Sequence, residues 1–247
     1  MVYLWREEKG CAGARNRGID AAHGDLLCFL DDDVKLFDDY FQQMDKYLSA
    51  NSSIGALGGN VLGDRLFTGW KGRLRKAIMR LFLLNDFNGR MTASGFGYPI
   101  NDRPIERPIF VDMLIGCNMV IRRPLFEKDR FDEWFTGYSY REDVDLTYRL
   151  SKRTRIIMIP EAKLYHYCSP TARISSFEKK QMQMKNYFYL FKKYKHKGLG
   201  STLLFSYSVL GLLVIDFLEL VTHHDQEALR VFTTSLRAVF SGLGSKK

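Results

Sequence analysis

Cysteine and proline are scarce in this chain of 247 residues, which has four cysteines and six prolines. No two cysteines form a C-x-x-C pair, which excludes the usual spacing of a structural zinc ribbon. We therefore expect Cys11, Cys28, Cys117 and Cys168 to be mostly buried free thiols in a reducing compartment. Because proline is rare and glycine contributes only 20 residues, a collagen-like or low-complexity chain is also excluded.

The first ten residues lack the apolar core of a secretory signal peptide. Met1–Gly10 reads MVYLWREEKG, which is too short and too charged for such a leader. Within this segment, Val2–Trp5 has the pattern of a β-strand. Apolar residues make up 46% of the chain and aromatic residues 14%, so a sizeable core can form and global disorder is excluded.

The chain carries a formal net charge of +9, with 37 basic and 28 acidic residues. This balance favours an acidic partner such as a nucleotide, a nucleic acid or an anionic membrane. Neither helix-turn-helix nor zinc-finger spacing occurs, so we expect no nucleic-acid partner.

Short apolar runs and segments of helical periodicity follow one another along the chain. The run Leu26–Leu30 suits a strand buried on both faces of a parallel sheet. Further strands are expected at 110–121, 156–159 and 163–167, and 54–61 is a short apolar stretch rich in glycine. Helical periodicity is found at 12–22, 38–50, 70–84, 141–153, 175–197 and 227–243.

Three consecutive carboxylates, Asp31, Asp32 and Asp33, follow the apolar run. Neighbouring carboxylates repel one another, and burying them without a partner is costly. A divalent cation resolves this repulsion, since Mg²⁺ and Mn²⁺ prefer carboxylate and phosphate oxygens. The alternative from the pattern alone is a solvated acidic turn before the next helix.

A second acidic pair, Glu142-Asp143, begins a predicted helix after an aromatic-rich segment. A carboxylate beside an aromatic side chain that stacks on a sugar is a candidate general base. The alternative is ordinary capping, because acidic residues favour the first turn of a helix. His166, at a predicted strand end, is either a metal ligand or a structural histidine.

Four short motifs within residues 1–170 become informative through their order. They are Ala14-Arg15-Asn16 with Gly18-Ile19, Ala22, Gly24-Asp25 and Phe29 to Asp33; Gly116-Cys117-Asn118-Met119; Phe135-Thr136-Gly137-Tyr138 with Glu142-Asp143-Val144-Asp145-Leu146 and Arg149; and Tyr165-His166. In this order they resemble the family 2 glycosyltransferases of the GT-A fold. The resemblance implies an α/β, Rossmann-like fold with a mixed, mostly parallel sheet flanked by helices, and a C-terminal helical tail.

The resemblance also implies roles for individual residues. The donor would be a nucleotide sugar, and the reaction an inverting displacement on a glycan or lipid-linked acceptor. By this resemblance, Asp143, in the pair with Glu142, would be the catalytic base, and Arg15, Asp31 and Asp32 would bind the nucleotide sugar. Trp134 and Gly116 would lie on the acceptor side, and Asp33, Asp31 and His166 would hold Mn²⁺ or Mg²⁺.

One departure from the family pattern concerns the start of the chain. The family opens with strands that contact the nucleotide, and this sequence starts at what resembles the third strand. We therefore expect residues 1–172 to be an N-terminally incomplete GT-A domain whose sheet exposes an apolar edge. Two other functions stay open: an inactive GT-A-like fragment that binds a membrane or partner, and a two-metal phosphoryl- or nucleotidyl-transfer enzyme.

Residues 173–247 are expected to form a helical tail that associates with a membrane. A lysine-rich segment at 175–197 precedes 18 uncharged residues at 198–215, and 70–84 predicts a basic amphipathic helix. The uncharged run would lie in the membrane interface, span the bilayer once, or cap the sheet as a soluble helix; 70–84 could equally be a solvated surface helix. We expect a cytoplasmic protein, peripheral on the inner face of the cell membrane and bound to anionic lipid.

Overall fold

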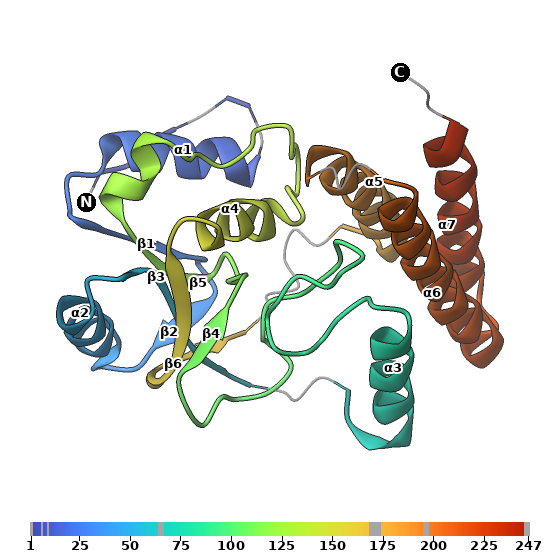
Figure 1. The fold of residues 1–247 in the computed structure, drawn as a ribbon, viewed down its shortest axis with the longest axis horizontal. Helices are drawn as coiled ribbons and strands as arrows, with labels where there is room; N and C mark the ends of the chain where they lie inside the picture. Colours follow the sequence, from blue (N-terminus) through green and yellow to red (C-terminus); the bar gives the residue numbers. More distant parts are fainter. Residues whose placement is uncertain are drawn as a thin grey trace. The chain divides into compact units, whose positions relative to one another are not determined.

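The computed structural model describes residues 2–5, 7–8, 10–63, 67–167, 174–194 and 198–244, with side chains to residue 241. The chain divides into two compact units (Figure 1). The first comprises Met1–Leu66, Phe87–Arg90 and Tyr98–Pro170, and the second comprises Phe67–Asp86, Met91–Gly97 and Thr171–Lys247. The second unit thus includes two segments, 67–86 and 91–97, that lie within the expected catalytic domain.

A six-stranded sheet forms the centre of the first unit. Its order is β1-β5-β3-β6-β2, and β4 also pairs with β6. The strands are β1 (Leu26–Leu30), β2 (Val34–Leu36), β3 (Ile54–Leu62), β4 (Ile109–Val111), β5 (Asn118–Arg122) and β6 (Arg155–His166). The α/β class with flanking helices is confirmed.

The expectation of a mostly parallel sheet is wrong. Among the strands that the described residues form, β3 and β6 run parallel and the other four pairings are antiparallel. The expectation rested on continuous apolar runs, which occur wherever both faces of a sheet are covered, whatever the strand direction. Here β1 pairs antiparallel with β5, and of its side chains only that of Leu27 is buried.

Helices cover both faces of this sheet (Figure 1). One face packs against α1 (Cys11–Ala21) and α4 (Glu142–Ser151), which contribute Ile19, Leu146 and Leu150 to the core. The other face packs against α2 (Tyr40–Ala50), through Tyr40, Met44 and Leu48. The short 3-10 helix η1 (Arg123–Glu127) follows β5.

Three expected strands differ from those observed. The segment 110–121 forms β4 and β5 with a loop between them, in which the amides of Asp112 and Met113 bond the Gly89 carbonyl at 2.8 and 3.1 Å. Conversely, 156–159 and 163–166 belong to one strand, β6, which passes through Pro160 and ends one residue before the expected Tyr167. The β3–β6 register shifts between Gly58 and Asn60, so the ladder tolerates a residue without an N–H there.

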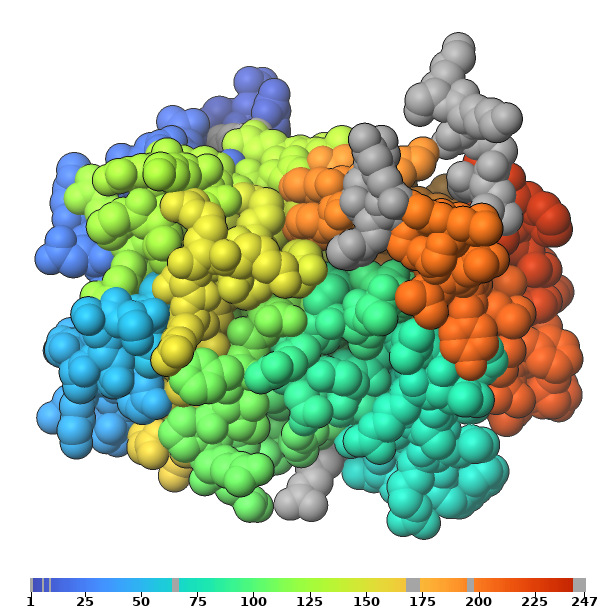
Figure 2. Space-filling model, viewed as in Figure 1, coloured from blue at the N-terminus to red at the C-terminus, as the bar shows by residue number. Residues whose placement is uncertain are grey.

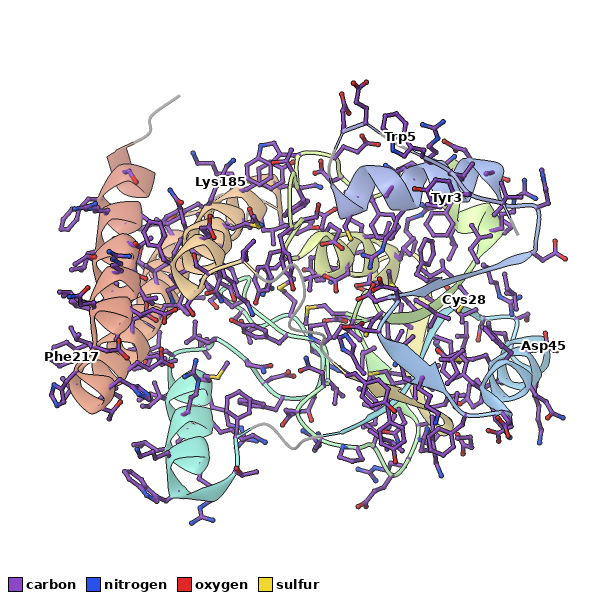
Figure 3. All side chains as sticks on the ribbon, turned by 180° about the vertical axis from the view of Figure 1, so that it is seen from behind. Tyr3, Trp5, Cys28, Asp45, Lys185 and Phe217 are labelled. Carbon is purple, nitrogen blue, oxygen red and sulfur yellow. The ribbon has the colours of Figure 1, made fainter. Side chains whose placement is uncertain are left out.

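The N-terminal segment and two of the cysteines are more exposed than expected. Val2–Trp5 has no regular secondary structure, and the side chains of Tyr3 and Trp5 are largely exposed (Figure 3). Cys11 and Cys28 are exposed and Cys117 is buried; Cys168 lies outside the described residues. The expectations of an N-terminal strand and of mostly buried thiols are therefore wrong at these positions.

The second unit is helical. It contains α3 (Gly69–Leu81), α5 (Ser176–Tyr194), α6 (Leu199–His223) and α7 (Gln226–Gly244), and α7 packs against both α5 and α6. A buried polar cluster joins three of them: Lys180 donates to Asp216 at 2.7 Å, and Ser235 donates to the other Asp216 carboxylate oxygen at 2.6 Å. Among the described residues, α6 alone is long and apolar enough to cross a membrane by length and composition, with 39% of its most apolar window buried.

Candidate active site

Functional side chains expected from the sequence converge at one end of the sheet in the first unit. The acidic turn joins β1 to β2, Gly116 precedes β5, Glu142 and Asp143 begin α4, and His166 ends β6. Because β1 and β5 pair antiparallel, with Leu30 opposite Asn118, the end of one strand lies beside the start of the other. The pairing of β2 with β6 brings Val34 opposite His166.

Arg15, on α1, lies at the centre of this arrangement. Its guanidinium donates to the Glu142 carboxylate and, at 3.1 Å, to Asp31, and it lies 5.5 Å from the centre of the Phe131 ring. The side chain is only 13% exposed. Burial by itself would lower the pKa of Arg15, but the neighbouring carboxylates, Glu142 above all, raise it. The guanidinium is therefore a fixed positive charge between two acidic segments.

Gly116 provides the space that the guanidinium occupies. A Cβ atom at this position would lie 2.7 Å from both terminal nitrogens of Arg15, closer than nonbonded atoms approach. The Gly116 amide also donates to the Asp143 carboxylate at 2.8 Å. Gly116 thus leaves room for the Arg15 guanidinium because it has no side chain, and its backbone N–H binds Asp143.

The two adjacent carboxylates of α4 have different environments. Glu142 is buried, and burial together with the neighbouring Asp143 raises its pKa to about 8, against the opposing effect of Arg15. Asp143 is half-buried, and its two carboxylate oxygens accept the N–H groups of Gly116 and Val144, at 2.8 and 2.7 Å. Asp143 also lies in the first turn of α4, where the helix dipole favours a negative charge.

The loop before α4 is held in a restricted conformation. Ser139 and Arg141 have positive φ angles of 51° and 80°, which non-glycine residues seldom adopt. The Ser139 hydroxyl donates to the Phe135 carbonyl at 2.7 Å and accepts the Cys11 amide at 3.0 Å. The strained turn is thereby tied to α1, which fixes the direction in which α4 starts.

A second cluster lies beside the first. His166 Nε2 is 3.1 Å from an Asp33 carboxylate oxygen, and His166 Nδ1 is 3.6 Å from Cys117 Sγ. Ligand atoms of Asp31, Cys117 and His166 lie within 4.8 Å of one another. Carboxylate oxygens with one imidazole suit Mn²⁺, so Asp31, Asp33 and His166 fit the expected cation. Cys117 was not anticipated, and its only signal was its place next to Gly116.

The remaining two predicted residues take peripheral positions. Asp32 is exposed at the tip of the turn between β1 and β2. Trp134 is half-buried, packs edge-to-face on Phe135 with ring centres 5.4 Å apart, and donates its backbone N–H to Asp132. The predicted contacts of Asp32 with the donor and of Trp134 with the acceptor stay predictions.

Comparison with models of known protein families gives one match. The model of the family "Glycosyl transferase family 2" matches residues 1–130, more than half of the chain. Among curated protein sequences, none matches.

The solved structures that match this chain include two glycosyltransferase complexes. GalNAc-T7 with UDP, GalNAc and Mn²⁺ aligns with 15% identity and a TM-score of 0.47, over 74% of this chain and 34% of that one. The mannosyltransferase PcManGT from Pyrobaculum calidifontis, with GDP-Man and Mn²⁺, aligns with 12% identity and a TM-score of 0.47, over 98% of this chain and 68% of that one. The chain thus spans about a third of the length of the first.

Replacing Gly116 by alanine should expel the Arg15 guanidinium from its position. The new methyl group would break the contacts with Glu142 and Asp31 and leave buried charge without its partner, lowering the free energy of unfolding by about 3–5 kcal/mol. Urea denaturation measures this change. Gly18→Ala is the matched control, because nothing lies within 4 Å of its added Cβ and it should stabilise α1 by roughly 0.5–1 kcal/mol. Equal stability of Gly116→Ala and the native protein would contradict the packing argument.

The raised pKa of Glu142 predicts a pH dependence of stability. The folded protein holds this proton up to about pH 8, whereas the unfolded chain releases it near pH 4.5, so the free energy of unfolding should fall as pH rises between these values. Glu142→Gln should remove that fall, measured by urea denaturation at a series of pH values. Glu161→Gln, at an exposed position, should leave it unchanged. A fall that persists in Glu142→Gln would assign the titration to another group.

Proposed function

The chain belongs to glycosyl transferase family 2, and from this premise we propose that it transfers a sugar from a nucleoside diphosphate donor to a hydroxyl group of a glycan or lipid-linked acceptor. The observation that carries the proposal is the convergence of Arg15, the Asp31–Asp33 turn, the Glu142–Asp143 pair and His166 at one end of the sheet. An inactive GT-A-like protein that binds a membrane or partner is the alternative.

On the donor side, positive charge and carboxylates are arranged to receive a diphosphate with a cation. Asp31, Asp33 and His166 would hold Mn²⁺ or Mg²⁺, which would neutralise the diphosphate as it leaves. Arg15 holds Asp31 in place through a 3.1 Å contact, and Asp32 extends the same turn towards solvent. The residues of this chain therefore position the donor more than they react with it.

On the acceptor side, Asp143 is the better base of the acidic pair. A base must reach the substrate while ionised, and Asp143 is half-buried in the first turn of α4. Glu142 is buried against Arg15 and acts as a positioning residue. The acceptor oxygen would form a bond to the anomeric carbon, the bond to the diphosphate oxygen would break, and the acceptor proton would pass to Asp143, with inversion at that carbon.

Asp143→Asn should lower the rate of sugar transfer by about 10²–10⁴-fold, because the amide cannot accept the proton. The measurement is nucleoside diphosphate release and product formation with a panel of nucleotide sugars and acceptors in the presence of Mn²⁺. Donor affinity should change little. Asp45→Asn, at an exposed position on α2, is the control for a neutralised surface carboxylate.

Two outcomes would contradict parts of the proposal. Full transfer by Asp143→Asn would remove Asp143 from the role of base. Donor binding without transfer or hydrolysis by the native protein, with every nucleotide sugar tested, would favour the inactive alternative.

We further propose that the second unit binds an anionic membrane surface through α3. Trp70, Leu74 and Leu81 lie on one side of this helix by their spacing and are exposed, Trp70 and Leu81 by 64% and 63%. Gly72 and Met79, on the opposite side, are buried. The helix therefore presents an apolar stripe away from the packed face, where a soluble protein normally has polar residues.

The charges of α3 support lipid as the occupant of this stripe. The 13 residues of α3 include five basic ones and no acidic one. By helical spacing, Lys71 and Arg73 lie on either side of the apolar stripe. Arg75 contacts Glu219 on α6. An exposed apolar stripe bordered by basic residues is typical of helices that lie in the plane of an anionic interface. Such binding would make the protein peripheral on the cytoplasmic face of the cell membrane.

The α3 stripe can be tested by vesicle flotation. The protein should bind vesicles of phosphatidylcholine with phosphatidylglycerol more strongly than pure phosphatidylcholine vesicles, and Leu74→Glu should weaken binding about tenfold or more. Phe41→Glu, at an exposed aromatic position on α2, is the matched control and should bind normally. Loss of binding in Leu203→Glu on α6 with retention in Leu74→Glu would assign the contact to α6, and absence of binding by the native protein would contradict the proposal.

A further inference from the structure

The thiol of Cys117 lies where the cation site of the proposed function calls only for oxygen and nitrogen. Its sulfur is 3.6 Å from His166 Nδ1, and both atoms lie within 4.8 Å of an Asp31 carboxylate oxygen. Cys117 is buried, and burial raises the pKa of its thiol. A buried cysteine alone is an ordinary small apolar residue, so the argument rests on its two neighbours.

The sulfur-to-nitrogen distance matches that of a tetrahedral metal centre. A zinc ion lies about 2.3 Å from a cysteine sulfur and about 2.0–2.1 Å from a histidine nitrogen, which at the tetrahedral angle separates the two ligand atoms by about 3.6 Å. The distance in this protein is 3.6 Å. A zinc ion could therefore contact both atoms without moving either side chain far.

The other ring nitrogen of His166 has the partner that a zinc-bound histidine usually has. His166 Nε2 is 3.1 Å from Asp33 Oδ1. Ligating histidines commonly donate their second N–H to a carboxylate, which fixes the tautomer and orients the ring. In this arrangement Asp33 accepts a hydrogen bond from His166 and does not contact the metal. In the Mn²⁺ or Mg²⁺ site of the proposed function, by contrast, Asp33 would contact the cation itself.

We propose that Asp31, Cys117 and His166 form a Zn²⁺ site, with Asp33 orienting His166 and the fourth position open to water. As the Zn–S bond forms, the thiol proton is released to solvent. Thiolate favours zinc, and carboxylate oxygens favour Mg²⁺ and Mn²⁺, so the two cation types compete for Asp31 and His166. The proposal concerns the same cluster of residues as the proposed sugar transfer but does not depend on that activity.

Metal titration of the full chain without donor or acceptor tests the site. Co²⁺ serves as a spectroscopic probe, because coordination by a thiolate produces a charge-transfer band in the near ultraviolet. We expect that band in the native protein, its disappearance on addition of Zn²⁺, and a loss of at least tenfold in Zn²⁺ affinity in Cys117→Ser. Cys28→Ser, on β1 outside the cluster, is the matched control and should retain both band and affinity.

Two further variants separate ligation from folding. Cys117→Ala should also lose the band, and a native-like circular dichroism spectrum and thermal transition would show that it still folds. Asp33→Asn should keep the band while Zn²⁺ affinity falls about 10–100-fold, as for other residues that orient a ligating histidine. Co²⁺ binding without a thiolate band, or equal Zn²⁺ affinity of the native protein and Cys117→Ser, would overturn the proposal whether or not the protein transfers sugar.

Discussion

The rest of the candidate site depends on the contacts that the Arg15 guanidinium makes. This guanidinium joins the turn after β1, 16 residues away in sequence, to the start of α4, 127 residues away. Arg15 and Glu142 are largely buried, so removing one of them leaves the other without its partner, whereas the Asp31 side chain is 39% exposed and its contact with Arg15 contributes less. The absence of a side chain at Gly116 lets these contacts form. Arg15 therefore holds the turn after β1 close to the start of α4.

This contact also explains how two adjacent carboxylates acquire different roles. Glu142 is directed into the protein towards Arg15, and burial raises its pKa to about 8. Asp143, one residue later on the helix, points elsewhere and accepts two backbone N–H groups. Successive residues of a helix face directions about 100° apart, so Glu142 can be buried against Arg15 while Asp143 stays partly exposed.

Sequence alone predicted the α/β class, most helices and the residues that gather around Arg15, because these depend on local periodicity and on motif order. Strand direction could not be predicted. An apolar run such as Leu26–Leu30 indicates that other residues cover the strand, but not whether the neighbouring strand runs parallel or antiparallel to it. The continuity of β6 through Pro160 depends on a register shift in β3, far away in sequence. The position of Cys117 beside His166 likewise could not be predicted, because the two residues are 49 positions apart in sequence, one before β5 and the other at the end of β6.

Composition alone could not decide whether α6 lies in a lipid bilayer or in a bundle of protein helices. An uncharged run of 18 residues suits a lipid bilayer and a buried bundle equally well. The next residue, Asp216, distinguishes them, because it contacts Lys180 on α5 and Ser235 on α7 and so directs one side of α6 towards protein. A carboxylate in lipid is costly, whereas here it is paired and hydrogen-bonded. Leu203, Leu210 and Phe217 of α6 are exposed. Part of α6 forms the surface in the space-filling view (Figure 2), and Phe217 is labelled in Figure 3, so one side of α6 packs on protein while apolar residues elsewhere on the helix stay exposed.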